Sequence, residues 1–121
     1  MRILLDQNAP RGLRDRLPGH EVVTARQMGW DTLANGALIA AAEAAGFGAM
    51  ITCDRNLAYQ QNLSGRRITL VVLDTNHWDV VRADIDRVRG AVGSVSVGAY
   101  IALSFERPVL RRRPYPGGSG E

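Results

Sequence analysis

The sequence predicts an α/β protein with a mostly parallel central sheet covered by helices. Short apolar runs alternate with amphipathic and alanine-rich segments, which is the pattern of buried parallel strands joined by helices. Three runs end at an aspartate, namely Asp6, Asp54 and Asp74. Because ligands of open α/β sheets bind outside the carboxyl ends of the strands, these carboxylates predict an acidic pocket suited to Mg²⁺ or Mn²⁺. The alternative is that each aspartate only caps a turn or helix.

Two strands and a helix are predicted at the start of the chain. Residues 2–5 form the first strand, and a helix follows over about 9–17, with Pro10 in the first turn where proline is tolerated. The arginines of this helix are expected mostly to face water. Residues 21–24 form a short second strand, whereas 26–33 show no clear pattern and are interpreted as a helical turn followed by a loop.

A helix and a buried strand are predicted next. Asn35 is a residue type that favours the N-cap position, and the alanine-rich run 36–45 predicts a helix that ends at Gly46. The strand 49–53 follows directly. Trp30, in the irregular stretch before this helix, is interpreted as a packing residue rather than a platform for stacking bases.

The second half predicts a strand, a helix and a last strand. Residues 68–73 form an apolar run that predicts the fourth strand. Apolar residues then recur at helical spacing and predict one amphipathic helix, at Trp78, Val81, Ile85, Val88 and Val92. Residues 97–103 predict the last strand, and their apolar character at an exposed sheet edge is compatible with a homodimer.

Composition limits the class of protein. The chain has 121 residues, of which 45% are hydrophobic, and this favours one globular domain. Its single cysteine, Cys53, excludes an internal disulfide framework and a cysteine-rich zinc site. With no long apolar span and no signal peptide, we expect a cytoplasmic protein without a membrane partner.

Two other doubly wound classes are disfavoured by missing residues. A phospho-receiver domain also uses an aspartate at a strand end, but it needs a lysine near that aspartate, and this chain has no lysine. A nucleotide-binding domain is expected to have a glycine-rich loop after its first strand. Residues 7–10, Gln-Asn-Ala-Pro, are not such a loop.

The positive charge is concentrated at the C-terminus. Residues 107–121 hold four arginines and one glutamate, which accounts for the net charge of +3, so that residues 1–106 are neutral. The tail is also rich in proline and glycine and is predicted to be disordered in isolation. RNA phosphates are its expected partners, with a solubilising extension or expression remnant as the alternative. The candidate RNA-binding residues are Arg55, Arg107, Arg111, Arg112 and Arg113.

Several motifs resemble those of short bacterial PIN-like proteins, which are related to toxin ribonucleases of the VapC type. The opening Leu-Leu-Asp-Gln-Asn-Ala-Pro is similar to Leu-Leu-Asp-Glu-Asn-Leu-Pro in that family. The other similar motifs are Pro-Gly-His-Glu-Val-Val-Thr, Asn-Gly-Ala-Leu-Ile-Ala-Ala-Ala-Glu-Ala-Ala-Gly, Ile-Thr-Cys-Asp-Arg-Asn-Leu and Tyr-Gln-Gln-Asn-Leu. The resemblance spans about residues 1–103 and excludes the tail.

The resemblance implies a three-layer α/β/α PIN-like sandwich with a mostly parallel central sheet over residues 1–106. It implies the toxin of a toxin–antitoxin pair, with a small antitoxin as partner, that cuts RNA using Mg²⁺ or Mn²⁺. Asp6 and Asp54 match the catalytic, metal-binding carboxylates of the family. Asp74, Asn35 and Asn56 are further candidate metal ligands, because amide oxygens can also ligate such ions.

Three departures from the family pattern replace a charge by a neutral residue. Gln7 stands where the family usually has glutamate, and Asn56 where an aspartate is common. At the start of the helix 36–45 the family has an acid, whereas this chain has only Asn35, Gly36 and Ala37. Fewer carboxylates weaken the hold on Mg²⁺. The alternative function is therefore a catalytically weakened PIN-like domain that binds RNA or a protein partner without turnover.

Overall fold

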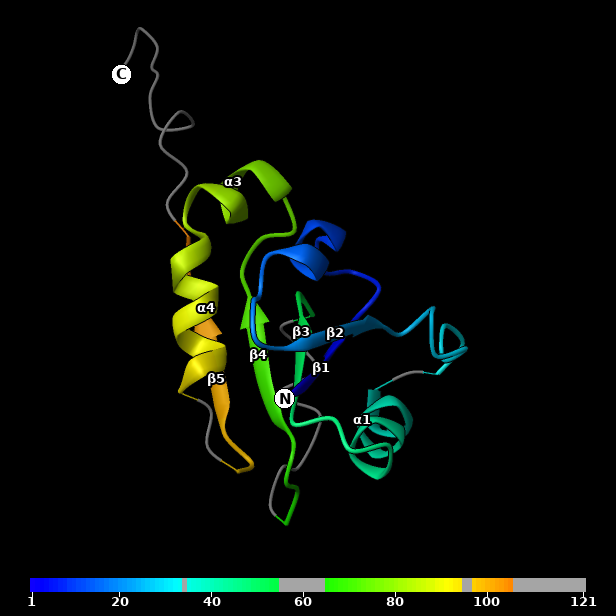
Figure 1. Cartoon of the computed structure of the whole chain (residues 1–121). Helices are drawn as coiled ribbons and strands as arrows, with labels where there is room; N and C mark the ends of the chain where they lie inside the picture. The colour runs from blue at the N-terminus through cyan, green and yellow to red at the C-terminus, as the bar shows by residue number, and fades with distance from the viewer. Residues whose placement is uncertain (34, 55–64, 95–96, 106–121) are drawn as a thin grey trace, which may run out of the picture.

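An all-parallel sheet of five strands forms the centre of the computed structural model (Figure 1). The structure describes residues 1–33, 35–54, 65–94 and 97–105. The strands lie in the order β2-β1-β3-β4-β5, so that β1 lies between β2 and β3. The predicted α/β class with a mostly parallel sheet is confirmed. The tail, Arg55 and Asn56 lie outside the described residues, and the calls on them stay predictions.

The strands occupy the apolar runs that predict them. Their bounds are Arg2–Leu5 for β1, Glu21–Thr24 for β2, Ala49–Thr52 for β3, Thr69–Leu73 for β4 and Tyr100–Leu103 for β5. The first two match the prediction, and the last three are shorter than predicted. The two strands β3 and β4 are buried at every position, as expected of parallel strands that are covered on both faces.

The helix predicted over 9–17 is wrong in length and type. A short 3₁₀ helix, η1, spans Arg11–Asp15 instead. It begins after Pro10, whose extended backbone (φ −64°, ψ 125°) keeps it outside the helix. At its other end Arg16 leaves helical geometry and donates its backbone N–H to the carbonyl of Leu13. Leu13 and Leu17 are nevertheless buried, so this segment still packs an apolar face against the core.

The other helices differ from prediction at their ends and at one break. The helix α1 spans Asn35–Ala44, so it begins at Asn35 and not after it. The amphipathic segment predicted as one helix is two, α3 (Trp78–Ala83) and α4 (Ile85–Gly93). Asp84 separates them, because its backbone (φ −131°, ψ 45°) is not helical. The apolar spacing continues across this break and therefore hides it in the sequence.

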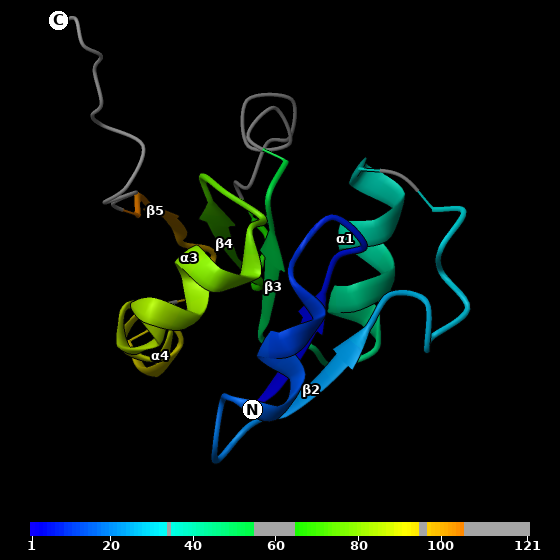
Figure 2. The same cartoon turned by 90° about the horizontal axis from the view of Figure 1, so that it is seen from above.

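Apolar side chains form two cores, one on each face of the sheet. Because strand residues alternate between faces, Ile3 and Leu5 pack with η1, α3 and α4, whereas Leu4 packs with α1. Seen from above, α1 lies on one side of the sheet and η1, α3 and α4 lie on the other (Figure 2). Trp30 packs edge-on against Phe47 in the α1 core, with 6.0 Å between ring centroids. Its interpretation as a packing residue is consistent with this contact.

One connection between parallel strands is left-handed. The chain moves in the same direction across the sheet from β2 to β3 through α1 and from β4 to β5 through α3 and α4. Since these helices cover opposite faces, the two connections have opposite hands. With the strands pointing up, α4 lies in front of β5 and to the left of β4, which makes the second connection left-handed (Figure 1). About 98% of such connections are right-handed. This rare arrangement places α3 and α4 on the same face as η1.

The 3₁₀ helix is held against the α3–α4 face by close packing. A Cβ atom on Gly12 would lie 2.4 Å from the indole of Trp78, so only glycine allows this approach. The guanidinium of Arg16 lies 5.6 Å from the centroid of the same indole ring, and Arg89 donates to the Arg16 carbonyl at 2.8 Å. These contacts fix the position of η1 and of the arginines that it carries. None of the helices in the described residues has the length and apolar character needed to cross a membrane.

Candidate functional site

The three aspartates predicted at strand ends lie at one edge of the sheet. Asp6 follows β1, Asp54 comes two residues after β3, and Asp74 follows β4. These strands are neighbours and parallel, so their carboxyl ends meet at the same edge. From β1 the chain turns first to β2 on one side and then to β3 on the other. The gap between β1 and β3 is therefore the topological switch point, where ligands of open α/β sheets bind.

A buried hydroxyl connects Asp6 with Asp54. Thr52, the last residue of β3, is fully buried, and its Oγ1 donates a hydrogen bond to Asp6 Oδ2 at 2.8 Å. The same Oγ1 accepts the backbone N–H of Asp54 at 3.0 Å. The other oxygen of Asp6 accepts the backbone N–H of Gln7 at 2.8 Å. Asp6 is thus held by a donor on each oxygen, in a fixed relation to the backbone of Asp54.

Asn8 ties the ends of β1 and β3 together. Its side-chain oxygen accepts the backbone N–H of Cys53 at 2.9 Å and lies 3.2 Å from Thr52 Oγ1. Neither Asn8 nor Thr52 was identified as a site residue from sequence. The usable signal is that Thr52 is the one hydroxyl in the apolar run 49–53, where a buried polar group needs a partner.

Asp74 belongs to the same edge but is engaged with β5. Its Oδ1 accepts the backbone N–H of Phe105 at 3.2 Å, and its own N–H donates to the carbonyl of Leu103 at 3.1 Å. It lines a pocket of about 380 Å³ with Asn8, Cys53 and the segment 75–77. Asp6 lines a different pocket. The contacts of Asp74 therefore assign it a structural role in holding the end of β5.

The pKa of the Cys53 thiol is raised by burial and in part by the negative charge at this edge. Burial first, and then the charges of Asp6 and Asp74, raise its pKa to about 11. The Sγ atom lies 3.3 Å from the carbonyl oxygen of Thr75, to which the thiol donates. Cys53 is therefore a neutral thiol near pH 7 and is unsuited to act as a nucleophile, which requires the thiolate.

The residues present are a partial fit for a divalent cation. In the described part of the chain, no group of three or more histidine, cysteine, aspartate or glutamate side chains is placed to hold a metal ion. Thr52 Oγ1 links the Asp6 carboxylate to the backbone N–H of Asp54. Mg²⁺ is commonly held by one or two carboxylates, with waters and substrate phosphates as its other ligands. Asp6, whose carboxylate is held in place, would be one such ligand, and Asp54 at the same edge of the sheet is the candidate for the second.

The neutral residues that replace acids have contacts of their own. The Nε2 group of Gln7 donates to the backbone carbonyl of Asp31 at 2.7 Å, a bond that a glutamate carboxylate cannot make. Gln7 therefore anchors the loop after β2. Glu43, which could in principle have compensated for a missing acid, instead accepts hydrogen bonds from the backbone N–H groups of Arg67 and Ile68, before β4. That is the opposite end of the sheet, so Glu43 cannot contribute to this site.

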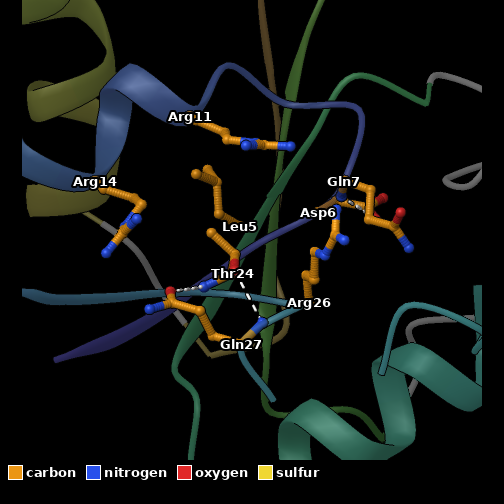
Figure 3. A pocket seen from close by; sticks show the side chains of 8 residues that line it. All are labelled: Leu5, Asp6, Gln7, Arg11, Arg14, Thr24, Arg26 and Gln27. Atoms are coloured by element: carbon orange, nitrogen blue, oxygen red, sulfur yellow. Dashed lines mark hydrogen bonds between the residues drawn. The ribbon is translucent and has the colours of Figure 1, made fainter. Parts of the chain in front are cut away.

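A second feature of the site is a pocket lined by three arginines, beside Asp6. The pocket has a volume of about 370 Å³ and lies between η1 and the end of β2 (Figure 3). Arg11 and Arg14 reach it from η1, and Arg26 reaches it from the turn after β2. The sequence predicts water-facing arginines in the segment 9–17, and Arg11 and Arg14 are indeed exposed, as is Arg26 in the turn after β2. What the sequence did not predict is that the fold gathers them around one pocket, which we call the arginine pocket.

No family model matches the sequence, and no curated protein or solved structure is significantly similar to it. The relation to PIN-like proteins therefore rests on the sequence motifs alone and stays a prediction. The function is therefore inferred from the contacts at the carboxyl edge of the sheet.

Proposed function

We propose that this protein is a metal-dependent ribonuclease of the PIN-like type and the toxin of a toxin–antitoxin pair. The observation that carries the proposal is the Thr52 hydroxyl, which donates to Asp6 and accepts from the backbone of Asp54 at the switch point of the sheet. Asp6 and Asp54 are the residues that would hold Mg²⁺ or Mn²⁺. A small antitoxin and RNA are the partners that belong to this proposal.

The chain's own residues supply positioning and charge. Hydrogen bonds to both oxygens of Asp6 fix the carboxylate, so that little rotational freedom is lost when a ligand binds. When bound, the cation lowers the pKa of its water and neutralises charge that develops on a phosphate. The arginines beside Asp6 attract the phosphate backbone. With only two carboxylates assured, we expect weak metal binding and slow cleavage.

The second candidate function is RNA binding without turnover. It is favoured by the contact of Gln7 with the loop after β2, because this glutamine is a built structural element and not merely a missing acid. It is also favoured by the engagement of Asp74 with Phe105. In this case the arginine pocket binds RNA while Asp6 has only a structural role.

The first test is metal binding measured by thermal unfolding. A hundredfold excess of Mn²⁺ over its dissociation constant should stabilise the wild type by about 2.7 kcal/mol. Asp6→Asn and Asp54→Asn should lose this gain, because each removes a charged oxygen ligand. Asp79→Asn is the matched control, since it removes an exposed α3 acid that pairs with Arg82 and takes no part in the contacts of Asp6, Thr52 and Asp54.

RNA cleavage by the same four proteins separates the two candidate functions. The ribonuclease proposal expects slow, Mn²⁺-dependent cleavage by wild type and Asp79→Asn, and none by the Asp6 and Asp54 variants. Induced expression in bacteria should arrest growth with the wild type but not with Asp6→Asn. RNA binding without cleavage, growth arrest or metal stabilisation supports the second candidate and refutes the first.

A further inference from the structure

The arginine pocket, lined by Arg11, Arg14 and Arg26 beside Asp6, is built to take an anion. We infer that it binds a backbone phosphate of a single-stranded RNA and so determines where the strand enters the site. The inference rests on the proposed function for the choice of RNA as ligand. The pocket itself is argued from its own charges and contacts, which involve no metal.

The charge of these three arginines is not neutralised by any ion pair among the described residues. In the described residues, five other arginines form ion pairs with acids, namely Arg2, Arg66, Arg82, Arg87 and Arg89. No ion pair in the same part of the chain involves Arg11, Arg14 or Arg26. A guanidinium group offers five N–H donors in a planar fork that matches phosphate oxygens. The pocket therefore has strong donors that are available to an anionic ligand.

Among the described residues that line the pocket Asp6 is the one acid, so these residues carry a net charge of about +2 from their ionisable side chains. Both oxygens of Asp6 already accept hydrogen bonds, from the Gln7 backbone and from Thr52. An anion bound among the arginines gains more from their three charges than it loses to this single carboxylate. The balance favours a phosphate over a cation at this position.

Hydrogen bonds hold the wall formed by the turn after β2 in place. Thr24 and Gln27 exchange two hydrogen bonds, from the Thr24 N–H to Gln27 Oε1 at 2.9 Å and from the Gln27 N–H to Thr24 Oγ1 at 3.0 Å (Figure 3). The backbone of Ala25 donates to Leu5 at 2.9 Å. These bonds fix Arg26 between two anchored residues. They also orient the Gln27 amide, so that its Nε2 group is a further donor on the pocket wall.

Size and position favour a nucleic acid strand over a lone ion. The volume of about 370 Å³ lies in the range of about 300–1,000 Å³ that ligand pockets occupy. A nucleotide unit uses this space, whereas a lone phosphate fills only part of it. The pocket also opens beside Asp6, where Mg²⁺ would take phosphate oxygens as ligands. A single strand is flexible enough to place one phosphate among the arginines and continue past Asp6.

The test is the salt dependence of binding to a fluorescein-labelled single-stranded RNA, measured by anisotropy in EDTA with the full chain. Each neutralised phosphate contributes about −0.7 to the slope of log affinity on log salt, so three contacts contribute about −2.1. The variant Arg11→Gln/Arg14→Gln/Arg26→Gln should flatten the slope by about 2. If the variant and the wild type bind equally at 1 M salt, the variant should therefore bind about 100-fold more weakly than the wild type at 0.1 M salt. These side chains are exposed, so the variant should fold normally.

A matched control removes three arginines that are ion-paired and do not contact η1. Arg66 is paired with Glu43, and Arg82 and Arg87 are each paired with an aspartate three residues earlier. Their replacement by glutamine removes the same formal charge, and we expect a slope close to that of the wild type. Arginines of the tail remain in both variants, so the difference between the two slopes reports on the pocket.

Equal slopes for the two triple variants would overturn the inference. So would binding of a mononucleotide as tight as binding of the RNA, since this would assign the pocket to a free phosphate compound. Because EDTA removes divalent ions, the result does not depend on cleavage. A flattened slope together with inactive wild-type protein would keep the RNA-binding pocket and reject the ribonuclease.

Discussion

Thr52→Val is the most direct perturbation of the site, because it removes the shared hydroxyl and nearly preserves the side-chain shape. The bond that the hydroxyl donates to the Asp6 carboxylate is of the charged kind, for which about 1.5–3 kcal/mol is typical. Its loss also leaves the Asp54 N–H without this acceptor, at a cost of about 1 kcal/mol. Asp6 is only partly buried, so a hydrogen bond from water recovers part of the free energy that is lost with the Thr52 hydroxyl. We expect the free energy of unfolding to fall by about 2.5 kcal/mol, or the Tm by roughly 10 °C.

Thr52→Ser is the control that keeps the hydroxyl. It removes one methyl group from a fully buried side chain, which costs about 1 kcal/mol. Urea unfolding should therefore rank the proteins as wild type, Thr52→Ser and Thr52→Val in order of falling stability. The response of Tm to Mn²⁺ should be retained by the serine variant and reduced in the valine variant, because only serine can still orient Asp6.

A double-mutant cycle with Asp6→Ala isolates the contact between the two side chains. Once Asp6 is alanine, Thr52→Val should cost about 1 kcal/mol less than it does in the wild type, since the bond is already absent. If valine is no more destabilising than serine, or if the cycle shows no coupling, the hydroxyl is not a shared partner of Asp6 and Asp54. The proposed site then loses its organising contact.

Three further predictions follow from the contacts of single residues. Asp6→Asn should lower the pKa of Cys53 below about 11 but not to the ordinary 9.0, because burial remains the larger cause; thiolate absorbance against pH measures this. The stability gained from the protonated thiol is full below pH 9.0 and is lost as the pH rises toward 11. Hydrogen bonding, first from the Arg67 N–H, holds the pKa of Glu43 below 4.5. Glu43→Gln should therefore be less stable than wild type at pH 7, with the difference in urea unfolding vanishing as the pH falls below 4.5. Gln7→Glu should lose about 1 kcal/mol in the same assay, since it cannot donate to the loop after β2.

The strands and the acidic edge could be predicted from sequence because they depend on local patterns. An apolar run bounded by polar residues marks a buried strand, and the residue that follows it lies at the carboxyl end wherever the strand sits. This is why Asp6 and Asp54 are found at one edge. The break at Asp84 could not be predicted, since the apolar spacing of α3 and α4 remains in phase across it.

The partners within the site could not be predicted because they depend on the pairing of distant segments. Thr52 meets Asp6 only because β1 pairs with β3 in a register that aligns Leu5 with Ile51. The arginine pocket joins η1 to the turn after β2, and the contact of Gly12 with Trp78 sets the position of η1. Charge and periodicity identify such side chains as solvent-facing but do not indicate which ones converge.

The place of β1 between β2 and β3 has a consequence for the order of folding. β1 is synthesised before the other four strands of this sheet, and it can pair with β2 as soon as residues 21–24 are available. The contact from Asp6 to Thr52 closes a separation of 46 residues and must wait for β3. Long-range closures of this kind are slow steps in folding. A nascent or truncated chain that ends before β3 therefore carries the first aspartate but no assembled site.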